Sequence, residues 1–206
     1  MQIQDMRVDM GFTKKKFPVA THMCLIYNSE RERKNVISKY IESGILNKEK
    51  VMYLADNVTK SDIGSWLMET GIDIESEEIQ KNLNVVEAEE AYISDGAFSP
   101  DKMLEGLKTT QAETMAENYS CLRASGEMTW ALKGIPGSEK LIEYESRLND
   151  LVQSHPFLAL CQYDANKFDG QTIFNVLKVH PYMIVKGQIL NNPYYITPDE
   201  FLKSQN

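Results

Sequence analysis

Cysteine is scarce in this sequence, which has only Cys24, Cys121 and Cys161 among 206 residues. An odd number of cysteines so far apart argues against a disulfide framework and suits a reducing compartment. The sequence also lacks any run of about 18 apolar residues that could cross a membrane. Asp5, Arg7 and Asp9 interrupt the region where a signal peptide needs an apolar core. We therefore expect free thiols, no membrane segment and a cytoplasmic location.

Clusters of basic residues are missing as well. The chain has 22 Lys and Arg against 30 Asp and Glu, a net charge of -8, and its longest basic run is Lys14–Lys16. Because binding to phosphates needs a clustered basic face, direct contact with nucleic acid is not expected. With 42% hydrophobic and 25% charged residues the chain is typical of a globular protein. Its length suits one domain, which we place at residues 18–206 after an N-terminal extension over residues 1–17.

What the sequence does contain is a regular alternation. Apolar runs of strand length alternate with segments of helical period, which is typical of βα units around a parallel sheet. Near the C-terminus, two short apolar runs flank Lys186–Gly187 and predict an antiparallel hairpin. The fold class is therefore α/β, a three-layer α/β/α sandwich with a mostly parallel sheet and antiparallel C-terminal edge strands. The five main strands are predicted at residues 23–27, 51–55, 83–88, 121–125 and 157–163.

The turn after the first main strand, residues 28–35, lies where this architecture tends to bind ligands. A phosphate-binding loop would have glycine at the positions of Asn28 and Arg33, followed by lysine and a hydroxyl residue. Lys34 matches the lysine, but both glycines are absent and Asn35 replaces the hydroxyl. Without glycine the backbone amides cannot easily form a phosphate cradle. We expect no ATP hydrolysis, no enzymatic activity and no cofactor. The segment is either a charged surface turn or a nucleotide site reshaped for another ligand.

Several segments match one family in order and spacing. The sequence resembles the MEDS family, a sensory domain shared by methanogens, methylotrophs and the dichloromethane repressor. The resemblance covers residues 18–203 and implies a RecA/KaiC-like fold without a functional phosphate loop. It also implies the sensing of hydrocarbon derivatives or one-carbon compounds. The matching segments are residues 22–27, 44–51, 123–130, 160–164, 180–181 and 192–194.

Members of this family are usually attached to a DNA-binding or signalling module. The present sequence departs from that pattern, because the segments before residue 18 and after residue 203 are too short to form one. We therefore expect signalling through a regulatory protein partner that carries the output function, or through a change in self-association as a homo-oligomer.

His22 and Cys24 are two residues apart on a predicted strand, so their side chains point to the same face. This pair could offer imidazole and thiolate to a soft metal ion, or a thiol activated by a neighbouring base. Two residues are too few for a closed metal site, and Cys161 is the only plausible third ligand. A buried cysteine can equally serve as a small hydrophobic residue. We expect no metal ion and keep all three residues as candidates for ligand contact.

Arg123, Glu127 and Trp130 emerge from the end of another buried strand, where a nucleotidase would carry its acidic residues. Glu127 could accept a hydrogen bond or pair with Arg123, and Trp130 with Met128 could form the wall of an apolar pocket. The alternative is a structural ion pair under a packed tryptophan. Both interpretations remain open at this point.

Tyr163 and Asp164 end the fifth strand, beside Tyr27 if these two strands are neighbours. Together with the residues above they would line a mid-sized, mostly apolar cavity suited to a small organic ligand. Asp164 could instead be a turn residue, and His180 is expected to end a helix. The preferred hypothesis is a non-catalytic sensor of a small molecule. The alternatives are a degenerate nucleotide-binding or transferase protein using Lys34 and Glu127, and a structural interaction module.

Overall fold

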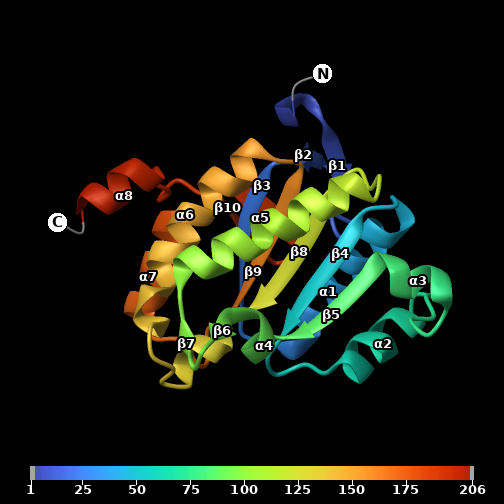
Figure 1. Ribbon diagram of the computed structural model, residues 1–206, viewed down its shortest axis with the longest axis horizontal. Helices are drawn as coiled ribbons and strands as arrows, with labels where there is room; N and C mark the ends of the chain where they lie inside the picture. The colour runs from blue at the N-terminus through green and yellow to red at the C-terminus, as the bar shows by residue number, and fades with distance from the viewer. Residues whose placement is uncertain (1–2, 205–206) are drawn as a thin grey trace.

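A seven-stranded sheet forms the middle layer of the structure, a computed structural model that describes residues 3–204 (Figure 1). The strand order is β11-β10-β3-β9-β8-β4-β5. All neighbours pair in parallel except β10 and β11, which form the antiparallel hairpin at the C-terminal edge. The predicted fold class is confirmed. The strands are β3 (Thr21–Tyr27), β4 (Lys50–Ala55), β5 (Leu83–Glu87), β8 (Leu122–Glu127), β9 (Phe157–Asp164), β10 (Tyr182–Val185) and β11 (Gln188–Asn191).

Helices cover both faces of this sheet. Helices α1 and α2 pack on one face, and α5, α6 and α7 pack on the other (Figure 1). No helix within residues 3–204 is both long and apolar enough to cross a membrane. The helices are α1 (Glu30–Leu46), α2 (Lys60–Met68), α3 (Glu77–Asn82), α4 (Ala88–Tyr92), α5 (Pro100–Ala116), α6 (Leu141–Ser154), α7 (Gly170–Val179) and α8 (Pro198–Ser204).

Short elements that the sequence pattern did not predict complete the fold. Two small hairpins are formed by β1 with β2 and by β6 with β7. Three 3-10 turns occupy the remaining connections. These elements are β1 (Arg7–Asp9), β2 (Lys16–Pro18), β6 (Ile93–Ser94), β7 (Ala97–Phe98), η1 (Ile3–Asp5), η2 (Met128–Leu132) and η3 (Ser138–Lys140).

Two helices begin at caps that are encoded in the local sequence. The Ser99 side chain accepts a hydrogen bond from the Lys102 amide, and Pro100 fills the first helical position of α5. Asp169 accepts a hydrogen bond of 2.7 Å from the amide of Thr172 at the start of α7. Each cap satisfies an amide that has no partner inside its helix.

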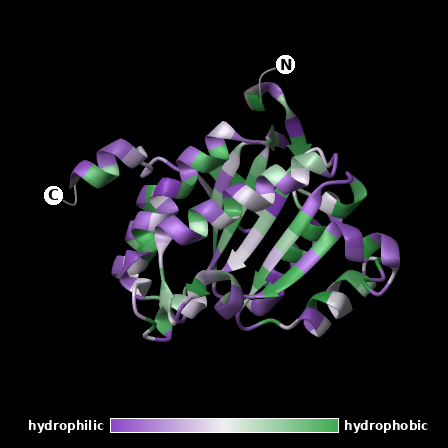
Figure 2. Cartoon of the chain, viewed as in Figure 1, coloured by the Kyte–Doolittle hydropathy of each residue, from purple (hydrophilic) through white to green (hydrophobic). Residues whose placement is uncertain are grey.

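Strand β3 divides its side chains between the two layers. Met23 and Leu25 join the core under α1, whereas His22 and Cys24 face the layer of α6 and α7. Successive residues of a strand point to opposite faces, so this alternation follows from the backbone. Figure 2 shows hydrophobic residues along the strands and hydrophilic residues spread over the helices. The two cores therefore lie on opposite faces of the sheet.

The N-terminal hairpin packs against the domain. Met10 is fully buried in the core under α1, and the predicted boundary at residue 17 falls inside β2. The main-chain oxygen of Asp9 accepts a hydrogen bond of 2.7 Å from Arg123 Nη2. Residues 1–17 were expected to be an extension, but Met10 belongs to the core and Asp9 binds the buried Arg123.

Arg123 is fully buried at the beginning of β8 and pairs with Glu49, which is also buried. Its Nη1 donates to the Tyr40 main-chain oxygen at 3.2 Å. Gly44 makes room for this side chain, since a Cβ there would lie 2.7 Å from Arg123 Cδ. A charge this far from water is tolerated only when it is paired and hydrogen-bonded.

Arg123→Met should lower the free energy of unfolding by about 3–5 kcal/mol, because it leaves the Glu49 carboxylate buried without its partner. Arg147→Met is the matched control. Arg147 is partly exposed and pairs with Asp101 and Glu143 at the surface, so it should cost no more than about 1 kcal/mol. Urea unfolding of both variants measures the difference, and equal losses would contradict this role of Arg123.

Candidate functional site

The nine residues predicted to contact a ligand are all buried. The most exposed of them, Asp164, keeps 7% of its surface accessible. They do not form one site, because they lie at the carboxyl edge of the sheet, at the opposite end of β8, and in a buried cluster against α6. The nine are His22, Cys24, Tyr27, Arg123, Glu127, Trp130, Cys161, Tyr163 and Asp164.

At the carboxyl edge, Glu127 accepts hydrogen bonds at both carboxylate oxygens. Its Oε1 accepts from the Tyr53 hydroxyl at 2.8 Å and from the Val58 amide at 3.3 Å. Its Oε2 accepts from the Asn57 amide at 2.7 Å and lies 3.3 Å from Arg33 Nη1. The carboxylate is therefore fully occupied by the protein's own donors.

Arg33 fills the crevice beside Glu127. Its side chain is 4% exposed, and its guanidinium lies 5.1 Å from the Tyr27 ring centre and 5.8 Å from that of Trp66. Burial opposes the charge, but Glu127 together with Tyr27, Tyr53 and Glu30 outweighs burial and holds the pKa of Arg33 above its ordinary value. In the sequence, Arg33 is notable only as a residue that replaces a loop glycine. The position of its side chain beside Glu127 was not predicted.

Lys34 points elsewhere. Its Nζ pairs with Glu69 Oε1 at 2.7 Å, just beyond the end of α2. The residue at the lysine position of a phosphate loop is thus bonded to a neighbouring helix rather than directed at Glu127.

Of the two roles considered for Glu127, it accepts hydrogen bonds and does not pair with Arg123. The two residues are four positions apart on one strand, which separates them by about 13 Å. Arg123 lies at the amino end of β8 and pairs with Glu49 instead. The alternative interpretation, a structural ion pair, describes Arg123 correctly but with a different acid.

Trp130 packs in an aromatic cluster. It stacks on Tyr92 with ring centres 4.6 Å apart and contacts Phe98 at the same distance. Phe98 in turn meets the ring of Tyr144 from α6 at 5.6 Å. Because Trp130 has no exposed surface, it lies inside the core and not at the wall of an open pocket.

Strands β3 and β9 are neighbours as predicted, with Tyr27 opposite Asp164 and Ile26 opposite Tyr163. Asp164 Oδ1 accepts hydrogen bonds from the Asn166 amide at 2.9 Å and from its side chain at 3.0 Å. Asp164 therefore acts as a turn residue, which was the alternative interpretation. The space between Tyr27 and Glu127, where an open cavity was expected, holds the side chain of Arg33.

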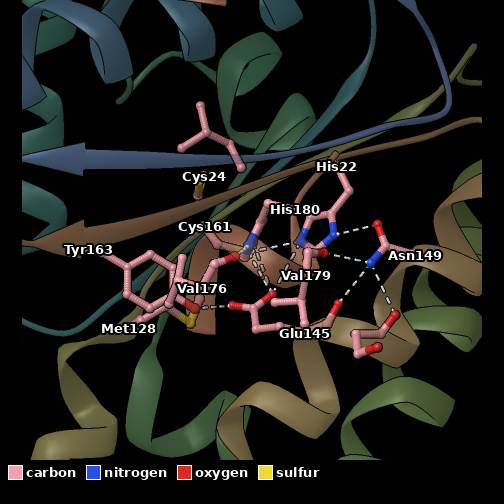
Figure 3. A network of polar contacts seen from close by, with 12 residues as sticks. His22, Cys24, Met128, Glu145, Asn149, Cys161, Tyr163, Val176, Val179 and His180 are labelled. Carbon is pink, nitrogen blue, oxygen red and sulfur yellow. Dashed lines mark hydrogen bonds and ion pairs between the residues drawn. The ribbon is translucent and has the colours of Figure 1, made fainter. Parts of the chain in front are cut away.

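The second group forms a polar cluster between the sheet and α6 (Figure 3). Glu145 Oε2 lies 3.2 Å from His22 Nε2, 3.3 Å from Cys161 Sγ and 3.5 Å from His180 Nε2. Cys161 Sγ is also 3.5 Å from His22 Nε2. The other carboxylate oxygen, Oε1, accepts a hydrogen bond of 2.5 Å from the Tyr163 hydroxyl. Residues from β3, α6, β9 and the end of α7 thus meet at one carboxylate.

Asn149 fixes the orientation of His22 in this cluster. Its side-chain amide donates to the main-chain oxygens of Glu145, Ser146 and Val179, so its oxygen faces His22 Nδ1 at 3.0 Å. That oxygen can only accept, and therefore His22 Nδ1 carries the proton. The free lone pair of His22 in its neutral form is on Nε2, which points to Glu145 and Cys161.

Burial and charge set the protonation states in this cluster. Burial on its own would raise the pKa of Glu145, but His180 and His22 outweigh burial and hold that pKa below its ordinary value. Burial and the Glu145 charge raise the pKa of the Cys161 thiol well above its usual range. Burial lowers the pKa of His22. Cys24 lies outside the cluster, with its thiol 3.8 Å from the Tyr182 main-chain oxygen.

Glu145, Asn149 and His180 belong to this cluster but are not among the nine residues predicted from the sequence. His180 ends α7 as expected, but its ring also faces Glu145. Leu141, Tyr144 and Leu148 recur at helical spacing in residues 138–152 and form an apolar stripe. Glu145 lies inside this stripe, and a carboxylate at such a position was the sequence signal for a buried polar site. The cluster combines thiol, imidazole and carboxylate groups, which are the donors of a metal site.

Cys161, His22 and Asn149 also resemble a thiol nucleophile with its base and orienting amide. None of the three is accessible, since His22 and Asn149 are each 1% exposed and Cys161 is 4% exposed. A substrate cannot reach a thiol in this position, and a protonated thiol is a weak nucleophile. The cluster is therefore a buried polar centre and not an open catalytic site.

An open groove lies elsewhere, over β4 and β5 and between α5 and the segment of α4 and β6 (Figure 1). Its volume is about 580 Å³. The floor and walls include Met52, Leu54, Val86, Tyr92, Met103 and Leu107. Lys50, Glu90, Lys102, Glu113 and Glu117 also line it.

A small void of about 20 Å³ shares part of this lining. Leu54, Tyr92 and Leu107 line both the groove and the void, and Cys161 lines the void from the other side. The void can hold about one water molecule. The void is thus lined both by residues of the groove and by Cys161 of the buried polar cluster.

The overall fold is KaiC-like. A KaiC-like protein of the hyperthermophilic archaeon Pyrococcus horikoshii OT3 superimposes with a TM-score of 0.64 over 87% of this chain and 80% of that protein, at 17% identity. The chain is also 32% identical over 80 residues to the transcriptional repressor DcmR of Methylorubrum extorquens strain DM4. That match covers 38% of this chain and 30% of the repressor, so the chain matches under a third of its relative's length.

Residues 21–181 match the family model named MEDS, which stands for methanogen/methylotroph, DcmR sensory domain. The chain therefore belongs to the MEDS family of sensory domains, as the sequence resemblance indicates.

The three thiols should be unreactive in the folded protein, because Cys24, Cys121 and Cys161 are all buried and burial raises the pKa of each. Ellman's reagent should label none of them under native conditions and all of them in guanidinium chloride with a chelator. Rapid native labelling of Cys161, identified by mass spectrometry, would show that the cluster is open to reagents and would restore the nucleophile interpretation.

Proposed function

We propose that this chain is a non-catalytic sensor that binds a small, mostly apolar organic molecule in the groove over β4 and β5. The observation that carries the proposal is the groove itself, which has an apolar floor and a volume of about 580 Å³ in a member of a sensory family. Pockets for small ligands typically have about 300–1,000 Å³ and a mainly apolar lining with a few polar groups.

The size of the groove favours a hydrocarbon derivative over a one-carbon compound, which would leave most of the volume empty. Met52, Leu54 and Val86 offer apolar contact from the sheet, and Tyr92 adds an aromatic surface with a hydroxyl. Lys102 and Glu90 could contact a polar group on the ligand. We infer an elongated or ring-shaped apolar body with one polar end.

The groove also offers a route to an output. It lies between strands and helix α5, so a ligand that binds only one arrangement of α5 would shift the population towards that arrangement. We infer that a regulatory partner, or a second copy of this chain, reads this change. The DcmR relative is a transcriptional repressor, which supports a regulatory role. The three free cysteines fit action in a reducing compartment such as the cytoplasm.

Gly106 provides a test of the groove. It lines the groove from α5, and a Cβ added there would meet no atom within 4 Å. Gly106→Phe should therefore fill the groove without disturbing the core, whereas Gly106→Ala should leave most of its volume open. A panel of short aromatics, thiols, methylated amines and halomethanes is screened for compounds that raise the melting temperature of the unmodified chain, since a ligand bound to the folded state stabilises it.

Any compound found in this way should lose its effect in Gly106→Phe and keep it in Gly106→Ala. Both variants should melt at or slightly above the unmodified chain, because replacing a helical glycine by alanine gains about 0.5–1 kcal/mol. An equal shift in all three proteins would place the ligand outside the groove. No shift with any compound would favour the structural interaction module instead.

MgATP should not bind at the carboxyl edge. Arg33 occupies the crevice next to Glu127, and Lys34 is paired with Glu69, so no cradle for a triphosphate is available. Isothermal titration calorimetry with MgATP should give no binding heat. Heat that disappears in Lys34→Ala would support the alternative of a degenerate nucleotide-binding protein and contradict this account of the edge.

A further inference from the structure

We propose that His22, Glu145, Cys161 and His180 form a closed binding site for one zinc ion in the interior of the domain. One ligand atom from each residue lies within 4.8 Å of the other three. The site goes beyond the proposed sensor function, because none of its four residues lines the groove.

Four of the six distances between the ligand atoms are close to those of a tetrahedral centre, and all six are within 4.8 Å. Ligands at zinc bond lengths of about 2.0–2.3 Å lie roughly 3.3–3.8 Å from one another. Glu145 Oε2 is 3.2 Å from His22 Nε2, 3.3 Å from Cys161 Sγ and 3.5 Å from His180 Nε2. Cys161 Sγ and His22 Nε2 are 3.5 Å apart. Small side-chain movements would therefore complete the geometry.

The partners around the site direct the lone pairs inward. His22 Nδ1 donates to Asn149 Oδ1 at 3.0 Å, and His180 Nδ1 donates to the Val176 main-chain oxygen at 2.8 Å. In its neutral form, a ring with its proton on Nδ1 has its lone pair on Nε2, and both Nε2 atoms face the centre. Tyr163 donates to Glu145 Oε1 and leaves Oε2 for the centre. Such outer hydrogen bonds fix the tautomer and orientation of metal-binding imidazoles.

Two further features favour a cation among these groups. His180 Nε2 is fully buried and has no hydrogen-bond partner among the described residues. With both Nδ1 atoms protonated, the neutral cluster brings two ring nitrogens and a carboxylate oxygen together as acceptors, and only the Cys161 thiol can donate. A divalent ion would satisfy all four groups, and the charges of a thiolate and a carboxylate would balance it. A neutral centre avoids the penalty of an uncompensated buried charge.

The donor set favours zinc. Two imidazoles, one thiolate and one carboxylate in four-coordinate geometry suit zinc, whereas magnesium and calcium prefer more oxygen ligands. All four ligands come from the protein, and none is exposed by more than 4%. A closed site of this kind holds structure and leaves no position for a substrate. Zinc would therefore link β3, α6, β9 and α7.

The test compares the full chain refolded from guanidinium chloride with excess zinc or with EDTA. After removal of free metal, the zinc sample should contain one equivalent of zinc and melt several degrees above the EDTA sample, because metal bound only to the folded state stabilises it. Refolding with Co²⁺ should give the visible bands of tetrahedral cobalt and a thiolate charge-transfer band. These readouts need no variant and do not depend on the groove ligand.

Matched variants assign the ligands. Cys161→Ser should abolish the charge-transfer band, whereas Cys24→Ser, which changes a buried thiol outside the set, should keep it. His180→Gln should lose the metal, whereas His155→Gln should retain it, since His155 bonds only the Leu151 main-chain oxygen. If a ligand variant does not fold, the metal content and melting temperature of the unmodified chain still decide the matter.

The proposal is overturned if the refolded chain holds no zinc above a protein-free blank and melts at the same temperature with zinc and with EDTA. Zinc that binds equally well to the Cys161→Ser variant would also overturn it by placing the metal elsewhere. Because no organic compound enters these measurements, failure of the zinc site and failure of the sensor proposal are distinguishable.

Discussion

The carboxylate of Glu145 is the constraint on which the arrangement of the domain depends. It has no exposed surface and contacts side chains from β3, β9 and the end of α7. Removing a carboxylate from water without compensation costs several kcal/mol. Helix α6 must therefore lie where His22, His180, Cys161 and Tyr163 can reach that group. A polar contact thus fixes the register between the helical layer and the sheet, while apolar packing supplies most of the burial.

A second buried charge explains why the usual ligand position of this fold is closed. Arg33 reaches Glu127 across the carboxyl ends of β3 and β8 and lies against the ring of Tyr27. Arg33 stands where a phosphate-binding loop has glycine, and its side chain occupies the space beside Glu127. The open surface is displaced to the face of β4 and β5, where α5 and the segment of α4 and β6 leave a groove.

Much of the fold could be predicted because its signals are local. The caps at Ser99 and Asp169 and the apolar runs of the parallel strands depend on neighbours in sequence. The short hairpins β1–β2 and β6–β7 were missed, since two or three residues carry no periodicity. The fourth predicted strand ended at residue 125, two residues before β8 ends. That error moved Glu127 beyond the strand and suggested a pairing with Arg123 that the backbone forbids.

Only part of the buried polar cluster could be predicted, because its contacts join residues that are far apart in the sequence. His22 and Cys161 were selected because their residue types carry chemistry, but Glu145 lies 123 positions from His22 in the sequence. Only the parallel crossover connections of the sheet bring them together, and no spacing rule encodes that contact. The groove had no sequence signal at all, because it arises where a helix does not cover the sheet.

The central claim is that Glu145 and its partners form one cation-binding centre, and anomalous diffraction tests it most directly. Crystals of the zinc-refolded chain, measured on both sides of the zinc absorption edge, should show a single strong peak bonded to His22 Nε2, Glu145 Oε2, Cys161 Sγ and His180 Nε2. A map with no peak there, and with the four side chains held only by hydrogen bonds to one another, would contradict the account.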